Sequence, residues 1–121
     1  MREALSWPCL AAVACGTAFL LAEEAGTGEV HRQMVRDGEK TAVTRAFSGR
    51  WARGVETQFM LDNVDAPAMY PHVNTLLGPL RKASAASGDS THVAAWAGSG
   101  FRHAREGSVD AIMQNLYPRF G

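Results

Sequence analysis

The sequence has few cysteines, no excess of charge of either sign and no apolar run of full membrane-spanning length. Its 121 residues include two cysteines, and 12 Lys plus Arg stand against 12 Asp plus Glu. Cys9 and Cys15 form neither a CxxC motif nor a disulfide framework, so we expect two buried, reduced thiols. The balanced charge provides no basic face of the kind that binds nucleic acid, and we therefore expect no nucleic-acid partner.

Metal-binding spacing is also absent from the sequence. The four histidines are scattered and form no motif such as HExxH. A surface or capping role is the default for each of them, at His31, His72, His92 and His103.

The length of the chain limits its architecture. A sequence of 121 residues is long enough for one modest domain with its own core. A closed (β/α)8 barrel typically needs about 250 residues, so the chain is too short to form one alone.

The first residues permit an alternative in which the chain is exported or attached to a membrane. Arg2 followed by the apolar residues 7–22 imitates a secretory signal, and Cys15 imitates a lipid-modified cysteine. Glu3 and Pro8 argue against this, and the run is shorter than the roughly 20 residues of a membrane span. A small helical, non-enzymatic protein with an N-terminal signal or anchor remains the alternative reading.

A short apolar run, AAVACGTAFLL at residues 11–21, is broken once, at Gly16 and Thr17. It favours a buried strand that ends in a turn, although periodicity alone does not separate such a strand from a buried helix. Gly16 lets the backbone approach a ligand, and Thr17 adds a hydroxyl and an N–H group. If a helix follows at residues 18–25, the turn would bind a phosphate. The alternative is that Gly16 and Thr17 only form the turn that ends the strand.

Capping signals and apolar spacing predict the remaining elements. We expect helices at residues 30–36, 55–62 and 79–87, and another that begins after Ser108. Residues 41–47 favour an extended conformation, and SGRWARG at residues 48–54 favours an irregular one. Glu23 and Glu24 lie at the wrong end of the helix predicted at residues 18–25 to favour its dipole, so we expect a solvated rim.

The most basic part of the chain contains Arg45, Arg50 and Arg53, with no acid between them. The planar guanidinium group binds phosphate or carboxylate through two parallel contacts, which gives a functional interpretation. We favour the structural interpretation, in which these arginines form salt bridges and contact backbone carbonyls between segments.

Several motifs, taken together, resemble one enzyme family. GTAFL, EEAG, His31, TRAFSGRWARG, APAMYP, LLGPLRKASAASGD and WAGSG follow the order and spacing of the C-terminal part of the nitronate monooxygenase (2-nitropropane dioxygenase) family. The resemblance implies the α/β class: the C-terminal fragment of an FMN-binding (β/α)8 TIM barrel, mostly helical on its own with one or two short strands. Residues 1–26 would supply the last barrel strand, the phosphate loop and the following helix, and residues 27–121 a helical extension.

The resemblance also implies an activity and a set of cofactor-binding residues. The activity is FMN-dependent oxidation of alkyl nitronates by O2. Ala14, Cys15, Gly16 and Thr17 match the family's phosphate loop, in which Ala14 stands where a glutamine is usual and contributes only backbone contacts. Ser99 replaces the glutamine of a WAGQG turn near the flavin and reaches less far. The alternative for that turn is a purely geometric role of its glycines.

The resemblance assigns no catalytic residue to this chain. The family's catalytic histidine lies upstream of the matched motifs, and none of the four histidines takes its place. We therefore expect a cytoplasmic fragment that is inactive alone and has no membrane partner. A lone barrel strand would expose its edges, which favours self-association.

Overall fold

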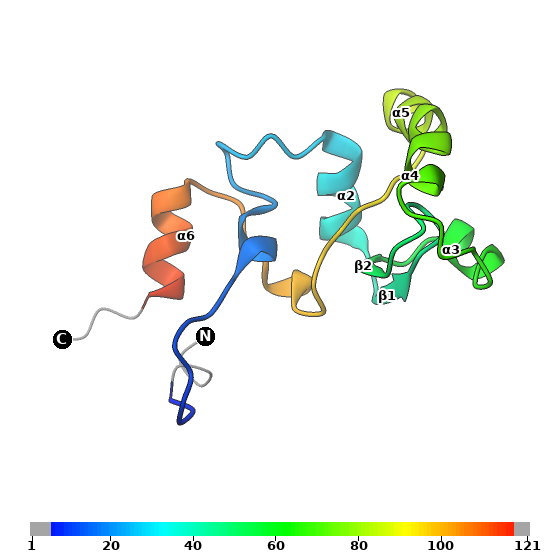
Figure 1. Ribbon diagram of the computed structural model, residues 1–121. Coiled ribbons are helices and arrows are strands. Elements are labelled where there is room, and N and C mark those ends of the chain that lie inside the picture. Colours follow the sequence, from blue (N-terminus) through cyan, green and yellow to red (C-terminus); the bar gives the residue numbers. More distant parts are fainter. Residues whose placement is uncertain (1–5, 118–121) are drawn as a thin grey trace.

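The computed structural model describes residues 6–117, which form short helices and one two-stranded sheet (Figure 1). In Figure 1, α6 and the N-terminal segment lie at one end of the molecule, the strands with α3, α4 and α5 lie at the other, and α2 lies between them. The elements, of which η1 and η2 are 3₁₀ turns, are η1 (Gly16–Phe19), α2 (Glu29–Asp37), β1 (Thr41–Thr44), β2 (Ala52–Val55), α3 (Gln58–Asp62), α4 (His72–Leu76), α5 (Gly78–Ser87), η2 (Phe101–His103) and α6 (Val109–Leu116).

Helix α2 confirms the helix predicted at residues 30–36 and extends it by one residue at each end. Glu29 lies in its first turn and Arg36 in its last, which suits the helix dipole. Gly38 follows directly, and a Cβ atom there would lie 2.7 Å from Cγ1 of Val55. The glycine therefore lets α2 end close against strand β2.

Strands β1 and β2 pair antiparallel, with Thr41 opposite Val55 and Thr44 opposite Ala52. The prediction of an irregular SGRWARG segment is wrong in its second half, which forms β2. The segment around Trp96 lies along the other edge of β2: the Val55 amide donates to the Ala95 carbonyl at 2.9 Å, and the Ala97 amide donates to the Arg53 carbonyl at 3.1 Å. Pairing on both edges thus overrides weak local strand propensity.

The main core lies between α2, β2 and the segment that runs from residue 93 to residue 104. Its buried members are Leu21, Met34, Val35, Val55, Val93, Ala95, Ala97, Phe101 and Ala104. Beside it, Phe47 is fully buried, with ring centroids 5.0 Å from Phe59 and 5.9 Å from Trp96. Phe47 therefore connects the β1–β2 loop to α3 and to the segment around Trp96.

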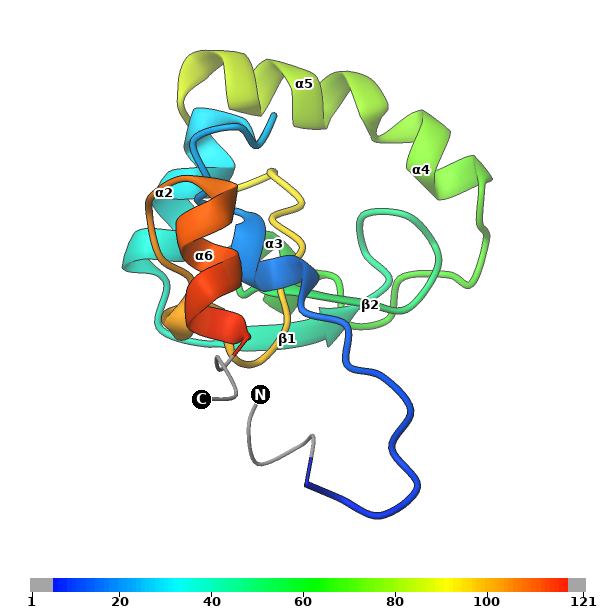
Figure 2. The same cartoon turned by 90° about the vertical axis from the view of Figure 1, so that its left-hand side faces the viewer.

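The helices after the sheet follow their capping signals. Helix α3 begins after Thr57, whose hydroxyl accepts from the Met60 amide at 3.4 Å, so the helix predicted at residues 55–62 starts later than expected. The helix predicted at residues 79–87 is confirmed as α5, which is separate from α4 (Figure 2). Gly88 ends α5 with a positive φ of 75°, which glycine adopts readily.

The N-terminal segment departs from the sequence prediction. Residues 10–15 form neither helix nor strand, so the expected strand is not present, and the helix expected at residues 18–25 is replaced by the four-residue turn η1. A strand needs a hydrogen-bonded neighbour, and none lies beside these residues in the described part of the chain. Cys9 is exposed and Cys15 is half-buried, so the prediction of two buried thiols is also wrong.

Helix α6 starts where the sequence predicts. The Ser108 hydroxyl accepts from the Ala111 amide at 3.2 Å. Ile112 is the residue of this helix that is buried. Helix α6 also contacts η1, which brings the last described helix against the start of the chain.

Replacing Phe47 with alanine should destabilise the protein by about 3–5 kcal/mol, because a fully buried aromatic ring would leave a cavity. Urea unfolding followed by circular dichroism measures the change. Leu76→Ala is the matched control: Leu76 is 77% exposed, so its truncation should change stability by less than about 0.5 kcal/mol. Equal effects of the two substitutions would contradict this account of the core.

Candidate functional site

A hydrogen bond joins the Gly16-Thr17 corner to the Gly-rich turn at residues 97–100. The Gly98 amide donates to the Thr17 hydroxyl oxygen at 2.9 Å, across 81 positions of sequence. The 3₁₀ turn η1, which begins with Gly16 and Thr17, is also in contact with η2, which follows the Gly-rich turn. Two segments that the sequence singled out separately therefore form one surface.

Arg32 of α2 holds the backbone that follows the corner. Its guanidinium group donates to the carbonyl of Leu21 at 2.8 Å and to that of Ala22 at 3.0 Å. Ala22 also forms a parallel bridge with Gly107, and the Glu23 amide donates to the Gly107 carbonyl at 3.0 Å. These contacts hold the backbone in a non-helical conformation directly after η1. They explain why Thr17 is followed by a short turn and not by a long helix.

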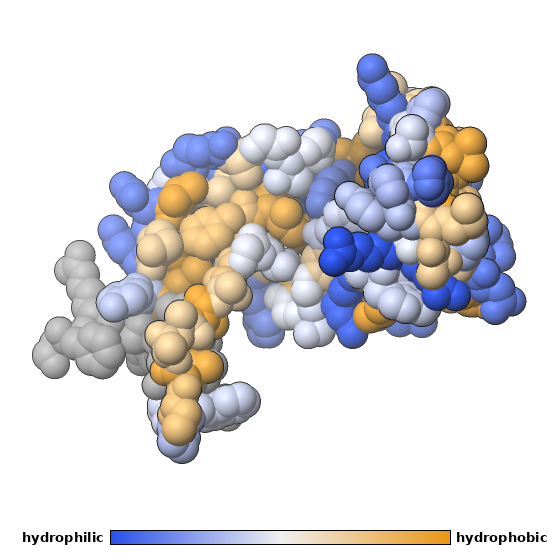
Figure 3. Space-filling view, viewed as in Figure 1, coloured by the Kyte–Doolittle hydropathy of each residue, from blue (hydrophilic) through white to orange (hydrophobic). Residues whose placement is uncertain are grey.

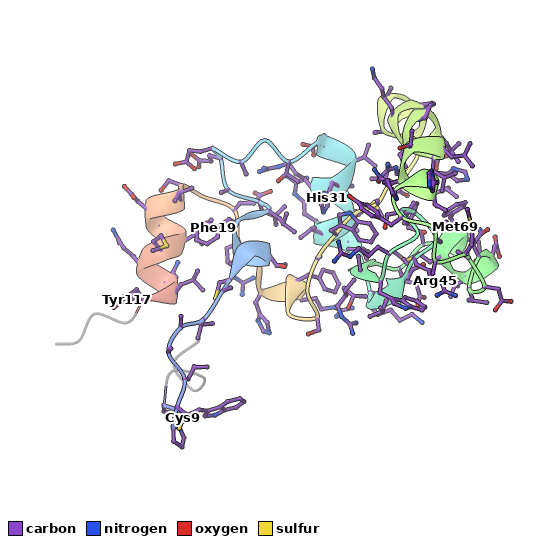
Figure 4. The ribbon with its side chains drawn as sticks, in the orientation of Figure 1. Cys9, Phe19, His31, Arg45, Met69 and Tyr117 are labelled. Carbon is purple, nitrogen blue, oxygen red and sulfur yellow. The ribbon has the colours of Figure 1, made fainter. Side chains whose placement is uncertain are left out.

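The Gly-rich turn is positioned by the hairpin and by α2. Gly54 of β2 bridges to Trp96, and a Cβ atom at Gly54 would lie 2.8 Å from the Ala95 carbonyl oxygen. His31 of α2 hydrogen-bonds through Nε2 to the Trp96 carbonyl at 3.1 Å. Figure 4 shows His31 on α2, next to the strand-like segment that leads to the turn.

Burial lowers the pKa of His31 from its ordinary value of 6.5, while the hydrogen bond to the Trp96 carbonyl acts in the opposite direction. Because that carbonyl accepts the hydrogen bond, the Nε2 atom carries the proton in the neutral ring. His31 therefore holds the turn in place as a neutral donor.

Unused donors gather on the surface that the two segments share. Within residues 6–117, the backbone N–H groups of Gly16, Thr17, Ser99 and Gly100 donate to no acceptor. The Thr17 oxygen accepts from Gly98, which leaves its own proton available to an outside acceptor. A Cβ atom at Gly16 would meet nothing within 4 Å, so the approach to the corner is open.

This donor set fits a phosphate group chemically. It consists of neutral amides and one hydroxyl, and backbone N–H groups that converge at a turn bind anions. The dipole contribution expected from a long helix is missing, because η1 has only four residues. Individual hydrogen bonds, and not a helix dipole, would hold an anion here.

The other residues assigned to the phosphate loop lie beside this surface. Ala14 is exposed, and Cys15 precedes η1, where its carbonyl accepts from the Ala18 amide at 3.1 Å. Ser99 is exposed in the turn. The structure therefore brings Gly16, Thr17 and Ser99 together and places Ala14 and Cys15 next to them in the chain.

The arginines of the basic block make structural contacts. Arg45 stacks over the Trp51 ring at 4.8 Å and donates to the Ala66 carbonyl, and Arg53 donates to the Thr41 hydroxyl at 3.1 Å. Figure 4 shows Arg45 at the end of the molecule that holds the sheet, on the far side of α2 from Phe19. These contacts agree with the structural interpretation of the block.

Glu24 has a role that local sequence patterns did not indicate. Its carboxylate oxygens accept from the Val109 amide at 2.9 and 3.2 Å, at the first turn of α6. Glu24 is exposed, as predicted, and in addition it caps the first turn of α6. No local signal identifies this contact, because the partner lies 85 positions along the chain.

Residues 6–117 contain no group of three or more His, Cys, Asp or Glu side chains arranged to hold a metal ion. Over the same residues, none of the helices combines the length and the apolar character needed to span a bilayer.

Comparison with known proteins shows the family of this chain. The family model described as nitronate monooxygenase matches residues 9–119. The chain belongs to the nitronate monooxygenase family. Probable nitronate monooxygenases from Staphylococcus aureus strains Newman and JH9 are each 34% identical to it over 110 residues, which cover 86% of this chain and 31% of the relative.

A solved structure shows the same relationship in three dimensions. The chain matches a nitroalkane oxidase from Streptomyces ansochromogenes with a TM-score of 0.81 and 42% identity, over 84% of this chain and 30% of that one. The fold is therefore that of a small, mostly helical part of a TIM-barrel enzyme, with two antiparallel strands. The chain spans less than a third of the length of the relatives that it matches.

The lowered pKa of His31 predicts a loss of stability in mild acid. The unfolded chain binds the proton more readily than the folded one, so the free energy of unfolding should fall as the pH drops through 6.5 to the lowered folded pKa. Urea unfolding at a series of pH values across this window measures the slope.

His31→Gln should flatten that slope, because glutamine keeps an N–H donor for the Trp96 carbonyl and does not titrate. His72→Gln, at an exposed position of α4, is the matched control and should retain the slope of the unsubstituted protein. A slope that His31→Gln leaves unchanged would assign the acid sensitivity to another group.

Proposed function

We propose that this chain supplies one side of the FMN phosphate site of a nitronate monooxygenase that oxidises alkyl nitronates with O2. The observation that carries the proposal is the hydrogen bond from the Gly98 amide to the Thr17 hydroxyl. It supports a single binding surface made of the Gly16-Thr17 corner and the turn at Ser99. The transfer of electrons from nitronate to oxygen is the chemistry that FMN supplies when it is bound.

Each assigned residue has a defined part in this proposal. Gly16 and Thr17 donate their backbone N–H groups to phosphate oxygens, and Thr17 adds its hydroxyl proton. The amides of Ser99 and Gly100 complete the donor set from the opposite side. Ala14 and Cys15 continue the loop through backbone atoms alone. Gly98 positions Thr17 and uses its own amide to do so.

We further propose that the chain alone does not turn over nitronate. A general base must lie within hydrogen-bond reach of the proton that it removes. His31 is engaged with the Trp96 carbonyl, and His92 packs its ring 5.2 Å from Phe59 and lies 3.3 Å from the Ser84 hydroxyl. His72 is exposed on α4, and His103 is exposed in η2, where its amide donates to the Gly100 carbonyl at 2.9 Å. A catalytic base would therefore come from barrel residues outside these 121.

The phosphate contact is tested by comparing FMN with riboflavin, which lacks the phosphate. In an NMR titration of the 121-residue protein, the amide resonances of Gly16, Thr17, Ser99 and Gly100 should shift with FMN at millimolar concentrations. Riboflavin should shift them much less, because only a phosphate matches these donors. Unchanged resonances up to about 10 mM FMN would contradict the proposal, since weaker binding corresponds to less than roughly 3 kcal/mol.

Thr17→Val should weaken FMN binding about tenfold or more, because a hydrogen bond to a charged group contributes about 1.5–3 kcal/mol. Thr75→Val is the matched control, since Thr75 is exposed on α4. Equal affinities of the two variants would remove Thr17 from the site.

Oxygen consumption tests the proposed inactivity. With an alkyl nitronate and added FMN, the isolated chain should consume oxygen no faster than a protein-free sample, because it contributes no positioned base. A rate that rises in proportion to protein concentration and disappears on heat denaturation would contradict this.

A further inference from the structure

A hollow of about 650 Å³ lies between the end of α2 and the segment that follows the Gly-rich turn. Figure 2 shows α2 and the segment between η2 and α6 on the same side of the molecule, and α2 also contacts η2. The floor of the hollow consists of buried core side chains: Leu21, Val35, Phe101 and Ala104. None of the described lining residues belongs to the donor set at Gly16, Thr17, Ser99 and Gly100, so the hollow is a separate place on the chain.

Charged side chains form the rim of this hollow. They are Arg36 and Asp37 of α2, Arg102 of η2, and Arg105 and Glu106 of the segment that follows. The Nε atom of Arg36 donates to the Glu106 carboxylate and its Nη1 atom to the Glu29 carboxylate, each at 2.8 Å. Asp37 accepts a hydrogen bond from the Gln33 side chain. Both acids of the rim therefore already have partners in the chain.

Arg102 and Arg105 are the cations of the rim that lack a carboxylate partner. Neither forms an ion pair with any residue from 6 to 117. The Nη2 atom of Arg102 donates to the Glu39 carbonyl, a neutral acceptor that holds the side chain in place without balancing its charge. Arg105 donates to no acceptor in the same part of the chain. Two unbalanced guanidinium groups at one hollow attract an anion more strongly than either does alone.

We propose that this hollow binds the phosphate group of a small phosphorylated molecule between Arg102 and Arg105. A phosphate monoester carries close to two negative charges and three terminal acceptor oxygens, which match two guanidinium groups. A single carboxylate carries one charge and two oxygens, and one guanidinium group satisfies both oxygens. The charge of the rim therefore favours phosphate over carboxylate.

The phosphate lies on the η2 side of the hollow. The C-terminal end of α2 carries carbonyl groups without helical partners, and these carbonyls and the Asp37 carboxylate repel an anion. The volume of about 650 Å³ is within the range of small-molecule sites and exceeds the space that a phosphate group needs. The rest of the ligand therefore extends across the floor toward α2.

The N-terminal run offers a contrasting surface. Figure 3 shows hydrophobic residues along it, and residues 6–21 include no Lys or Arg. A phosphate finds no cation there, so its attraction to the hollow depends on Arg102 and Arg105.

This inference goes beyond the FMN site and does not depend on it. An NMR titration of the 121-residue protein with adenosine 5′-monophosphate tests it, with adenosine, which lacks the phosphate, as the comparison ligand. The backbone amides and the Nε–H groups of Arg102 and Arg105 should shift with the monophosphate at millimolar concentrations, and adenosine should shift them much less. Raising the salt concentration from about 0.05 M to about 0.5 M should weaken the binding severalfold, because salt screens exposed charges.

Substitutions identify the groups that hold the phosphate. Arg105→Gln should weaken binding of the monophosphate about threefold to tenfold, because it removes a charged donor that is exposed to solvent. It removes no hydrogen bond or ion pair within residues 6–117, so the fold should be unaffected. Lys82→Gln, at an exposed position of α5, changes the charge equally and should leave the affinity unchanged. Thr17→Val should also leave it unchanged, because Thr17 does not line the hollow.

Four results would overturn the proposal. The first is the absence of shifts at Arg102 and Arg105 up to about 10 mM monophosphate, which limits the binding free energy to less than roughly 3 kcal/mol. The second is a loss of affinity in Lys82→Gln equal to that in Arg105→Gln, which would show attraction to net charge alone. An equal loss in Thr17→Val would assign the binding to the FMN site. Binding of succinate as tight as that of the monophosphate would assign the hollow to dicarboxylates.

Discussion

The hydrogen bond between the Gly98 amide and the Thr17 hydroxyl is the constraint on which the rest of the site depends. It satisfies the Gly98 amide and uses the Thr17 oxygen as an acceptor, so that the hydroxyl proton is not needed for this contact. Both partners are held by backbone contacts: Arg32 fixes the carbonyls after η1, and β2 fixes the segment before the turn. The position of one hydroxyl group thus depends on α2 and on the hairpin together.

The described residues provide a cluster of unused amide donors, and contacts from α2 and from the hairpin support it. They correspond to less than a third of the length of a TIM-barrel enzyme.

Local signals predicted the elements whose stabilising contacts are local. Helix α2, the start of α6 after Ser108 and the helix predicted at residues 79–87 are confirmed, because charge, capping and positive φ act within a few residues. The errors at residues 11–25 and at β2, and the missed contact of Glu24, share one cause: each depends on a partner far along the chain. For the same reason, the resemblance selected Thr17 and the Gly-rich turn, but nothing in the sequence indicated that a backbone amide would join them.

Gly54 illustrates how far the support of the site extends. It carries no functional atom and lies on a strand away from the donor cluster, but the Ala95 carbonyl occupies the space where its side chain would be. The Ala95 carbonyl therefore fixes the register between the hairpin and the segment around Trp96. That register in turn sets how close the Gly98 amide comes to the Thr17 hydroxyl. The hairpin thereby sets the distance between the Gly-rich turn and Thr17, so a bulkier residue at position 54 would change the spacing of the donors.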